Sequence, residues 1–416
     1  MLPTSKYLLL PALLSCTAAF SQNSVSPYSS YGIGEIDNGY YNRSSGMANT
    51  GMAISSPFFM VDNNPAAIAA LPKSFFLLSA GTAGRTTRYR GDAIGLANSN
   101  AKDFWIKRLG LTFKMTDHWA SGIGFRQFSN INYQFAGTKP VEGANLQYAA
   151  IYQGDGGLNE YYWNNAVSLG KHFSIGVKSS IIAGSVNRTE SVSDEALTTV
   201  IETRQQDYYG NARFQFGAQY NTTLGKKWGL SLGGKYIPKT LLNSERTITV
   251  SENSTVISEE ESVLANNFSL PQGFSAGFAL KKNNRNTYAV DYTYDDWSAL
   301  GLKGTGWQMT SAQRLSAGVE FAKQVYMGSQ YAEKRFFQLG VFASDAYLQV
   351  SNQLIREYGF TAGVGGAVNS TLLYNIAAEV GSRGTTRAKL IRENYVQVTI
   401  ALSFRDFLQS KGRKYD

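Results

Sequence analysis

Histidine and cysteine are scarce in this sequence of 416 residues, which has two of the first and one of the second. The histidines, His118 and His172, stand in short turn-like stretches with no serine–aspartate pair nearby, so a histidine-based catalytic centre is not supported. Cysteine and histidine also show no metal-site spacing. We therefore expect no enzyme activity and no requirement for a metal or another cofactor.

Long apolar runs are missing as well. Beyond the N-terminus no apolar stretch approaches the roughly 18 residues of a transmembrane helix, and the mean hydropathy is −0.23. This excludes a helical membrane protein, although a β-barrel would hide its apolar residues by alternating them with polar ones. Only 9 prolines occur, against 41 glycines, 25 tyrosines and 23 phenylalanines. That composition is typical of many strands, tight turns and aromatic girdles.

The N-terminus and the net charge bear on location and partners. Lys6, an apolar run over residues 7–14 and small residues up to Ser21 predict a secretory signal peptide at residues 1–21. Alternatively, Leu13-Leu-Ser-Cys16 resembles a lipobox, which would leave Cys16 lipidated.

The net charge of +9 is spread along the chain and forms no single basic stripe, so we expect no nucleic-acid partner.

Residues 394–404 show the clearest strand pattern. One parity is apolar and the other is polar or small; the apolar parity consists of Val396, Val398, Ile400, Leu402 and Phe404. Ten such residues, tilted by about 40°, rise about 25 Å, which is the height of the apolar band of a bilayer. About fourteen comparable stretches follow Ser74. We predict an all-β, antiparallel transmembrane barrel over residues 74–404, followed by a short basic periplasmic tail at 405–416. A soluble β-sandwich is the alternative architecture.

Short and long connections alternate between the predicted strands. The short ones are 116–118, 170–172, 225–227, 281–286 and 368–371, and the long ones are 132–160, 185–208, 239–270, 296–312, 344–357 and 383–393. Outer-membrane barrels place short turns in the periplasm and long loops outside, so both termini are expected to be periplasmic. The connection from Phe321 to Lys334 is an exception, because it must be periplasmic and yet is long.

Charged residues fall on the parity opposite to the apolar one. A lysine or arginine that faces lipid at mid-membrane costs about 2–4 kcal/mol, so these residues must face the lumen. The acidic candidates are Asp291, Asp295, Glu320 and Glu379, and the main basic candidates are Arg126, Lys178, Arg213 and Lys235. Two interpretations are open: the charges pair with one another and hold the wall, or the basic ones contact the acidic head group of a ligand.

Residues 22–73 do not alternate and are rich in serine, glycine and asparagine, yet too apolar for a disordered leader. Asn64 is predicted to cap a short helix with Pro65 at its first position. Ser45-Gly46 with Gly51, followed by Asn64-Pro65-Ala66 and a barrel, resembles the FadL family of outer-membrane transporters. The pair Trp297-Ser298 and the glycine-rich stretch 358–365 are also similar to that family.

The resemblance implies a fourteen-stranded barrel in the Gram-negative outer membrane, with an N-terminal hatch at residues 22–73 inside it. It also implies passive transport of long-chain fatty acids or other hydrophobic small molecules, with lateral exit at a kink in the third strand. Gly122 and Gly124 lie on that strand and are the candidates for the kink.

A second hypothesis uses the same architecture differently. The type IX secretion barrel PorV resembles FadL but handles protein partners, and a PorV-like binding or scaffold barrel in an outer-membrane complex would need no ligand channel. A lipid hydrolase is disfavoured by the shortage of histidine. The sequence therefore leaves a hydrophobic ligand, the surrounding lipids or a protein complex as partners.

Overall fold

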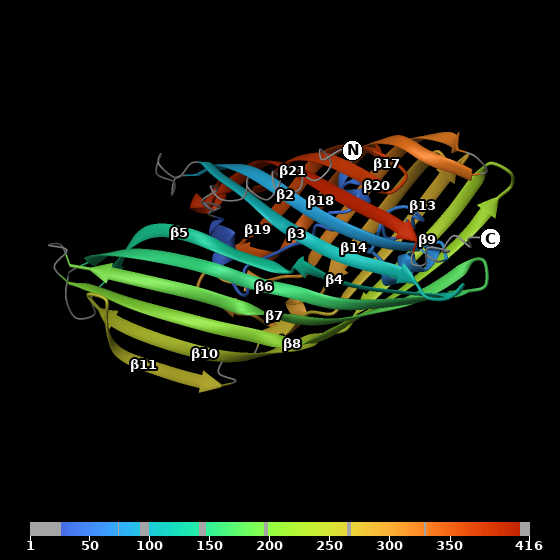
Figure 1. The fold of residues 1–416 in the computed structure, drawn as a ribbon. Coiled ribbons are helices and arrows are strands. Elements are labelled where there is room, and N and C mark those ends of the chain that lie inside the picture. Colours follow the sequence, from blue (N-terminus) through green and yellow to red (C-terminus); the bar gives the residue numbers. More distant parts are fainter. Residues whose placement is uncertain are drawn as a thin grey trace, which may run out of the picture.

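The computed structural model describes residues 26–73, 75–91, 100–140, 147–194, 199–263, 268–327 and 330–407. Within these ranges the wall is a closed antiparallel barrel of fourteen strands (Figure 1), which confirms the predicted fold class. The first strand, β2 (Phe75–Arg90), closes the barrel by pairing with the last, β21 (Arg392–Phe407), along all 16 of its residues. The predicted signal peptide, Cys16 and residues 408–416 of the predicted tail lie outside the described residues.

The other wall strands follow in chain order, and three of the fourteen are interrupted. After β2 come β3 (Asn100–Lys114), β4 (Trp119–Gln127) with β5 (Ser129–Pro140), β6 (Gln147–Leu169), β7 (Phe173–Ser193), β8 (Val200–Leu224), β9 (Trp228–Ile237) with β10 (Thr240–Glu252), β12 (Phe268–Leu270) with β13 (Gly273–Lys282), β14 (Asn286–Asp295), β17 (Ala312–Met327), β18 (Gln330–Val350), β19 (Gln353–Ala367), β20 (Leu372–Gly384) and β21. Outside the wall, β11 (Thr255–Val263) forms a hairpin with β10. The β14–β17 connection holds η7 (Trp297–Leu300), β15 (Lys303–Gly304) and β16 (Trp307–Met309), and η8 (Arg387–Lys389) precedes β21.

Side chains alternate across the wall as the sequence predicts. On β21 the apolar residues Val396, Ile400 and Phe404 are exposed on the outside, whereas Tyr395 and Ala401 are buried. The same outward apolar parity recurs on the neighbouring strands. A sandwich core would have buried these residues, so the alternative architecture is wrong. Among the described residues, no helix has the length and apolar character needed to cross a membrane.

The predicted short connections all lie at one end of the barrel, called here the turn end. The prediction of long loops at the other end is largely wrong, because most of the described residues in those stretches form paired strands. β7 is paired with β8 along all 21 of its residues, and β18 and β19 meet at a two-residue turn, Ser351-Asn352. The connection between Phe321 and Lys334 is likewise mostly the paired ends of β17 and β18. Only 296–312 and 383–393 keep substantial irregular parts.

The long strands carry the sheet far past the apolar band. A strand of 21 residues is roughly 70 Å long and, tilted by about 40°, rises about 50 Å, twice the height of the apolar band. In Figure 1 the far parts of β5 to β8, with β10 and β11, project together at the end opposite the turn end. We call this projection the ledge; it comprises residues 131–140, 147–156, 185–193, 200–208 and 245–263.

The N-terminal segment, residues 26–73, lies across the lumen. It contains η3 (Pro27–Ser30), β1 (Glu35–Ile36), η4 (Arg43–Met47) and η5 (Pro65–Ala70), and η4 and most of η5 are buried. On one side η4 contacts β17 to β20, and on the other η5 contacts β4, β6, β7 and β8. The segment therefore connects opposite walls of the barrel.

Candidate functional site

Asn64 both begins η5 and attaches it to the wall. Its Oδ1 accepts a hydrogen bond from the Ala66 N–H at 3.0 Å, which is the predicted helix cap, and Pro65 follows at the first position. Its Nδ2 donates to the carbonyl oxygens of Ala218 at 2.9 Å and Gly234 at 3.1 Å, on β8 and β9. One side chain thus satisfies a helix terminus and fixes the helix to two strands.

Two other predicted residues of the segment, Gly51 and Gly46, contact the wall at β14 and β19. The backbone N–H groups of Gly51 and Met52 donate to Oδ2 of Asp291 at 2.7 and 2.8 Å. The Gly46 carbonyl accepts from the Thr361 hydroxyl at 2.9 Å, and Ser45 is buried beside it. The sequence-predicted set Ser45, Gly46, Gly51, Asn64, Pro65 and Ala66 therefore lies where the segment meets the barrel wall.

Five ion pairs between described residues, which the sequence did not reveal, also join the segment to the wall. They are Arg43–Glu320 at 2.6 Å, Asp37–Lys107 at 2.9 Å, Asp62–Arg108 at 3.1 Å, Glu35–Arg85 at 3.6 Å, and Glu35–Arg383. Arg43 is bidentate on Glu320, with a second contact at 2.9 Å from Nε. Removing one member of such a buried pair typically costs about 3–5 kcal/mol, because the other charge stays buried without compensation. The segment is therefore held firmly.

Asp37 lies in the segment beside β1. Burial disfavours its charged form, but Lys107 and Arg126 outweigh burial, so the pKa of Asp37 is held below its usual value. Its carboxylate also accepts a hydrogen bond from the Tyr41 hydroxyl at 2.7 Å. This carboxylate is consequently charged at neutral pH and fixes β1 against β3.

The four basic lumen residues predicted from the sequence are mostly engaged with other groups. Arg126 and Lys178 approach the buried carboxylate of Glu160 at 3.3 and 3.5 Å, while Lys235 donates to the Tyr40 hydroxyl at 2.7 Å. Arg213 stacks its guanidinium on the Phe128 ring at 5.4 Å. Arg126, Arg213 and Lys235, but not Lys178, line a lumen cavity of about 180 Å³.

The third wall strand is interrupted at Phe128, between β4 and β5. Up to that point β4 pairs with β3, but β5 has no ladder with β3 among the described residues. The free edge of β5 instead pairs with β1, with Ile36 opposite Ser129. Gly122 and Gly124, the predicted kink positions, lie within the regular part of β4. The interruption is accompanied by left-handed-region glycines on β6, Gly156 (φ +106°) and Gly157 (φ +146°).

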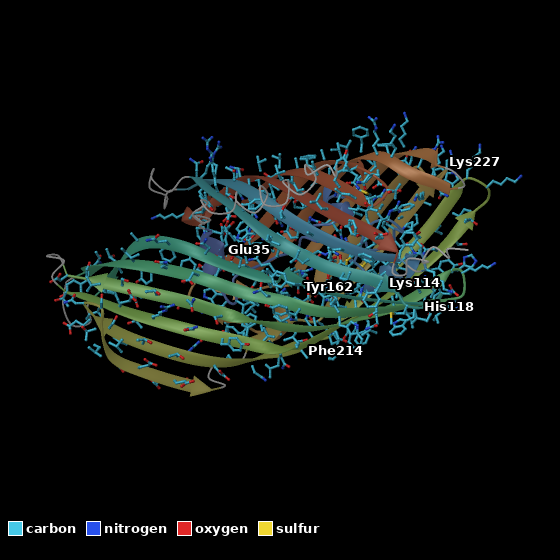
Figure 2. All side chains as sticks on the ribbon, in the orientation of Figure 1. Glu35, Lys114, His118, Tyr162, Phe214 and Lys227 are labelled. Atoms are coloured by element: carbon cyan, nitrogen blue, oxygen red, sulfur yellow. The ribbon has the colours of Figure 1, made fainter. Side chains whose placement is uncertain are left out.

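The segment divides the space inside the barrel. A cavity of about 380 Å³ lies on its turn-end side, lined by residues that include Arg43, Ile54 and Glu320. Cavities of about 180 and 110 Å³ lie on its other side, and charged side chains line both. Figure 2 shows Glu35 and Tyr162 within the outline of the barrel, and His118 and Lys227 at the turn end.

An apolar cluster packs above the smaller cavities, toward the ledge. Its buried members are Ile33, Phe128, Ile131, Tyr133, Leu158, Ile182, Val186, Tyr209, Leu242, Phe268, Leu270, Trp297 and Met309. Leu158, Ile182 and Leu242 are fully buried, so the side chains pack against one another with no solvent between them. The end of the lumen nearest the ledge is therefore filled.

A fourteen-stranded wall with an N-terminal segment across its lumen defines a class of outer-membrane-type barrels. A similar fold occurs in a Pseudomonas aeruginosa FadL homologue, with a TM-score of 0.57 and 14% identity over 88% of this chain and 98% of that one. The CymD monoaromatic hydrocarbon channel is also similar, with a TM-score of 0.55 and 15% identity over 94% of this chain and 99% of that one. The toluene transporter TodX of P. putida has a TM-score of 0.57 and 13% identity over 89% of this chain and 99% of that one. These identities establish a shared fold only, and no curated protein matches the sequence. The BamG family model matches residues 4–416, so the chain belongs to the BamG family.

Proposed function

We propose that this protein is a binding or scaffold barrel of the Gram-negative outer membrane, which holds a protein partner through its ledge. The ledge is the observation that carries the proposal. Two of its strands continue for about 25 Å beyond the apolar band, and their outward residues there, such as Ser185 and Asn187, are polar. A regular sheet with water on both faces serves no purpose in crossing lipid, but it offers a rigid surface to another protein. In this orientation the ledge is extracellular and the end of β21 is periplasmic. Ser26, the first described residue, instead lies toward the ledge end, where its hydroxyl donates to Glu393 at 2.7 Å, which does not support the expected periplasmic N-terminus.

The filled lumen also supports a scaffold. Five ion pairs and the hydrogen bonds of Asn64 and Asp291 hold the segment across the barrel, and the apolar cluster closes the ledge end. The cavity nearest that end, at about 180 Å³, is smaller than the roughly 300 Å³ of a small ligand site, and charged side chains line it. Desolvating those charges with a hydrocarbon would cost several kcal/mol per ion.

The test is native purification at the natural expression level. A tagged chain, extracted from outer membranes in a mild detergent, should migrate with a defined partner at fixed stoichiometry. A variant in which a short turn replaces residues 245–263 is purified in parallel with the tagged wild-type chain. This variant should fold normally, as judged by heat-modifiable migration. A wild-type protein that migrates only as a single chain would overturn the scaffold proposal.

Hatch-gated transport is the second candidate, and the interruption at Phe128 is the observation that favours it. There the wall lacks a ladder between β3 and β5 among the described residues, and β1 and η3 of the segment cover the edge of β5. In this function the segment is the hatch, and displacing it would join the cavities on its two sides. A hydrophobic small molecule, such as a long-chain fatty acid, would leave sideways into the membrane. Arg213 and Lys235 would contact its head group.

Two variants test transport. Deleting residues 63–71 should change the uptake of labelled oleate or toluene if the segment gates passage. A disulfide between Ile36→Cys and Ser129→Cys, which are register partners, should abolish uptake until a reductant is added. The only native cysteine is Cys16, so Cys16→Ser gives a clean background and the matched control. Uptake that neither change affects would count against a hatch.

A further inference from the structure

The outermost strand of the ledge, β11, has one free edge. It pairs with β10 from Glu245↔Val263 to Glu252↔Thr255, and its other side has no partner in the described part of the chain. In Figure 1 it is the last strand of the projecting sheet. Its apolar residues Val256 and Ile257 are 57% and 59% exposed. A strand of nine residues is thus open to water along one full edge.

Natural proteins usually protect such an edge. Lysine, proline, a bulge in the edge strand or a covering loop prevents another chain from pairing with the free N–H and C=O groups. β11 contains neither lysine nor proline. Its one bulge is at Ile257, which is left without a partner between the pairs Val250↔Ser258 and Ser251↔Val256, and it lies beside the turn, so the pairing from Ser258 to Val263 is regular. The β-branched residues Thr255, Val256 and Ile257 favour an extended backbone. The edge is therefore competent to pair with another strand.

The hairpin is also acidic in an otherwise basic protein. Between Thr240 and Val263 there are five acidic residues and one basic one: Glu245, Glu252, Glu259, Glu260 and Glu261, with Arg246. Arg246 is already engaged by Asp207, 2.6 Å from its Nε. None of the five glutamates forms an ion pair within the described residues. Their charge is available to a partner, whereas the chain as a whole carries +9.

We propose that the free edge of β11 binds an extended, basic segment of the partner protein by strand addition. The backbone edge would supply the hydrogen bonds, and the glutamates would select for lysine or arginine. Glu259, Glu260 and Glu261 alternate between the two faces of the sheet, so they do not converge on a metal ion. The inference rests on the proposed scaffold function and assigns its surface.

The test uses the full-length barrel in detergent and two nine-residue peptides of high β-propensity, one with lysine and one with glutamate at every second position. Fluorescence anisotropy should show binding of the lysine peptide, weakened by salt, and at least tenfold weaker binding of the glutamate peptide. The triple variant Glu259→Lys, Glu260→Lys, Glu261→Lys should invert this preference. Glu202→Lys on β8, within the sheet, is the matched control and should leave it unchanged. No binding of the lysine peptide, or no inversion, would overturn the inference.

The same triple variant separates this inference from the scaffold function. In native purification it should lose the partner that migrates with the wild-type chain. A complex that the triple variant retains would place the partner elsewhere on the barrel, which overturns the role of β11 and leaves the scaffold function standing. A wild-type chain without any partner would overturn both.

Discussion

Two adjacent glycines on β9 provide a matched test of how the N-terminal segment docks. A Cβ on Gly233 would overlap the Met52 carbonyl oxygen and lie 2.6 Å from its carbonyl carbon. A Cβ on Gly234, which faces the other side of the wall, would meet nothing within 4 Å. Gly233→Ala should therefore displace the segment at Met52, whereas Gly234→Ala should not.

The size of the effect follows from what Met52 holds. Its N–H and that of Gly51 donate to the carboxylate of Asp291, and its carbonyl accepts from Gln219 at 2.9 Å. Hydrogen bonds to a charged group contribute about 1.5–3 kcal/mol each, so losing the two on Asp291 costs about 3–6 kcal/mol of docking free energy. Even the lower value raises the undocked population by roughly 100-fold.

Hydrogen exchange measured by mass spectrometry reads this out directly. Peptides that cover residues 49–56 should lose protection in Gly233→Ala and keep it in Gly234→Ala, while strands β2 and β21 stay protected in both. Heat-modifiable migration on a gel should show a folded barrel for each variant. Equal protection of residues 49–56 in the two variants would refute the packing argument.

Three further predictions concern other parts of the structure. Arg43→Leu should weaken docking of the N-terminal segment by about 3–5 kcal/mol, since it leaves the buried carboxylate of Glu320 without its counter-charge. Adding Glu320→Gln to the same chain should restore part of the docking free energy, and hydrogen-exchange protection of η4 measures both effects. The lowered pKa of Asp37 means that its stabilising contribution is complete above the usual carboxyl pKa of about 4 and is lost as the pH falls through its folded-state pKa. The thermal midpoint of the wild type should consequently drop more between pH 6 and pH 3 than that of Asp37→Asn, and parallel profiles would contradict this. Ile400→Arg places a charge on the outward face and should reduce folding stability in lipid vesicles by about 2–4 kcal/mol in denaturant titrations, and a change under 1 kcal/mol would count against a lipid-facing β21.

The sequence predicted the barrel because its strands face two different solvents. On β21 an apolar outside and a polar inside impose a strict alternation, which can be recognised without a structure. The ledge was not predicted for the same reason: β11 reads Thr-Val-Ile-Ser-Glu-Glu-Glu-Ser-Val, and water on both faces imposes no alternation. Only backbone pairing with neighbours makes these stretches strands, and that pairing is not visible in side-chain parity.

In the candidate site, too, the features that depend on adjacent residues were predicted from the sequence, and those that depend on distant residues were not. The cap at Asn64-Pro65 depends on adjacent residues, so local chemistry predicted it. The pair Arg43–Glu320 joins residues 277 positions apart, and nothing local marks them as partners. The interruption at Phe128 depends on the registers of β3, β5 and β6 together, so the glycines of β4 alone did not indicate it.

The unequal joints of the wall have a mechanical consequence. The first and last strands are paired along all 16 residues of β2, whereas the third strand separates from β3 at Phe128 and is bridged there by β1 and η3 of the N-terminal segment. The barrel wall is therefore weakest at the third strand and not where the first and last strands meet. A force on the N-terminal segment would break its contacts with β5 while the pairing of β2 with β21 stayed intact. The same stretch of chain therefore both crosses the lumen and covers the interruption in the wall.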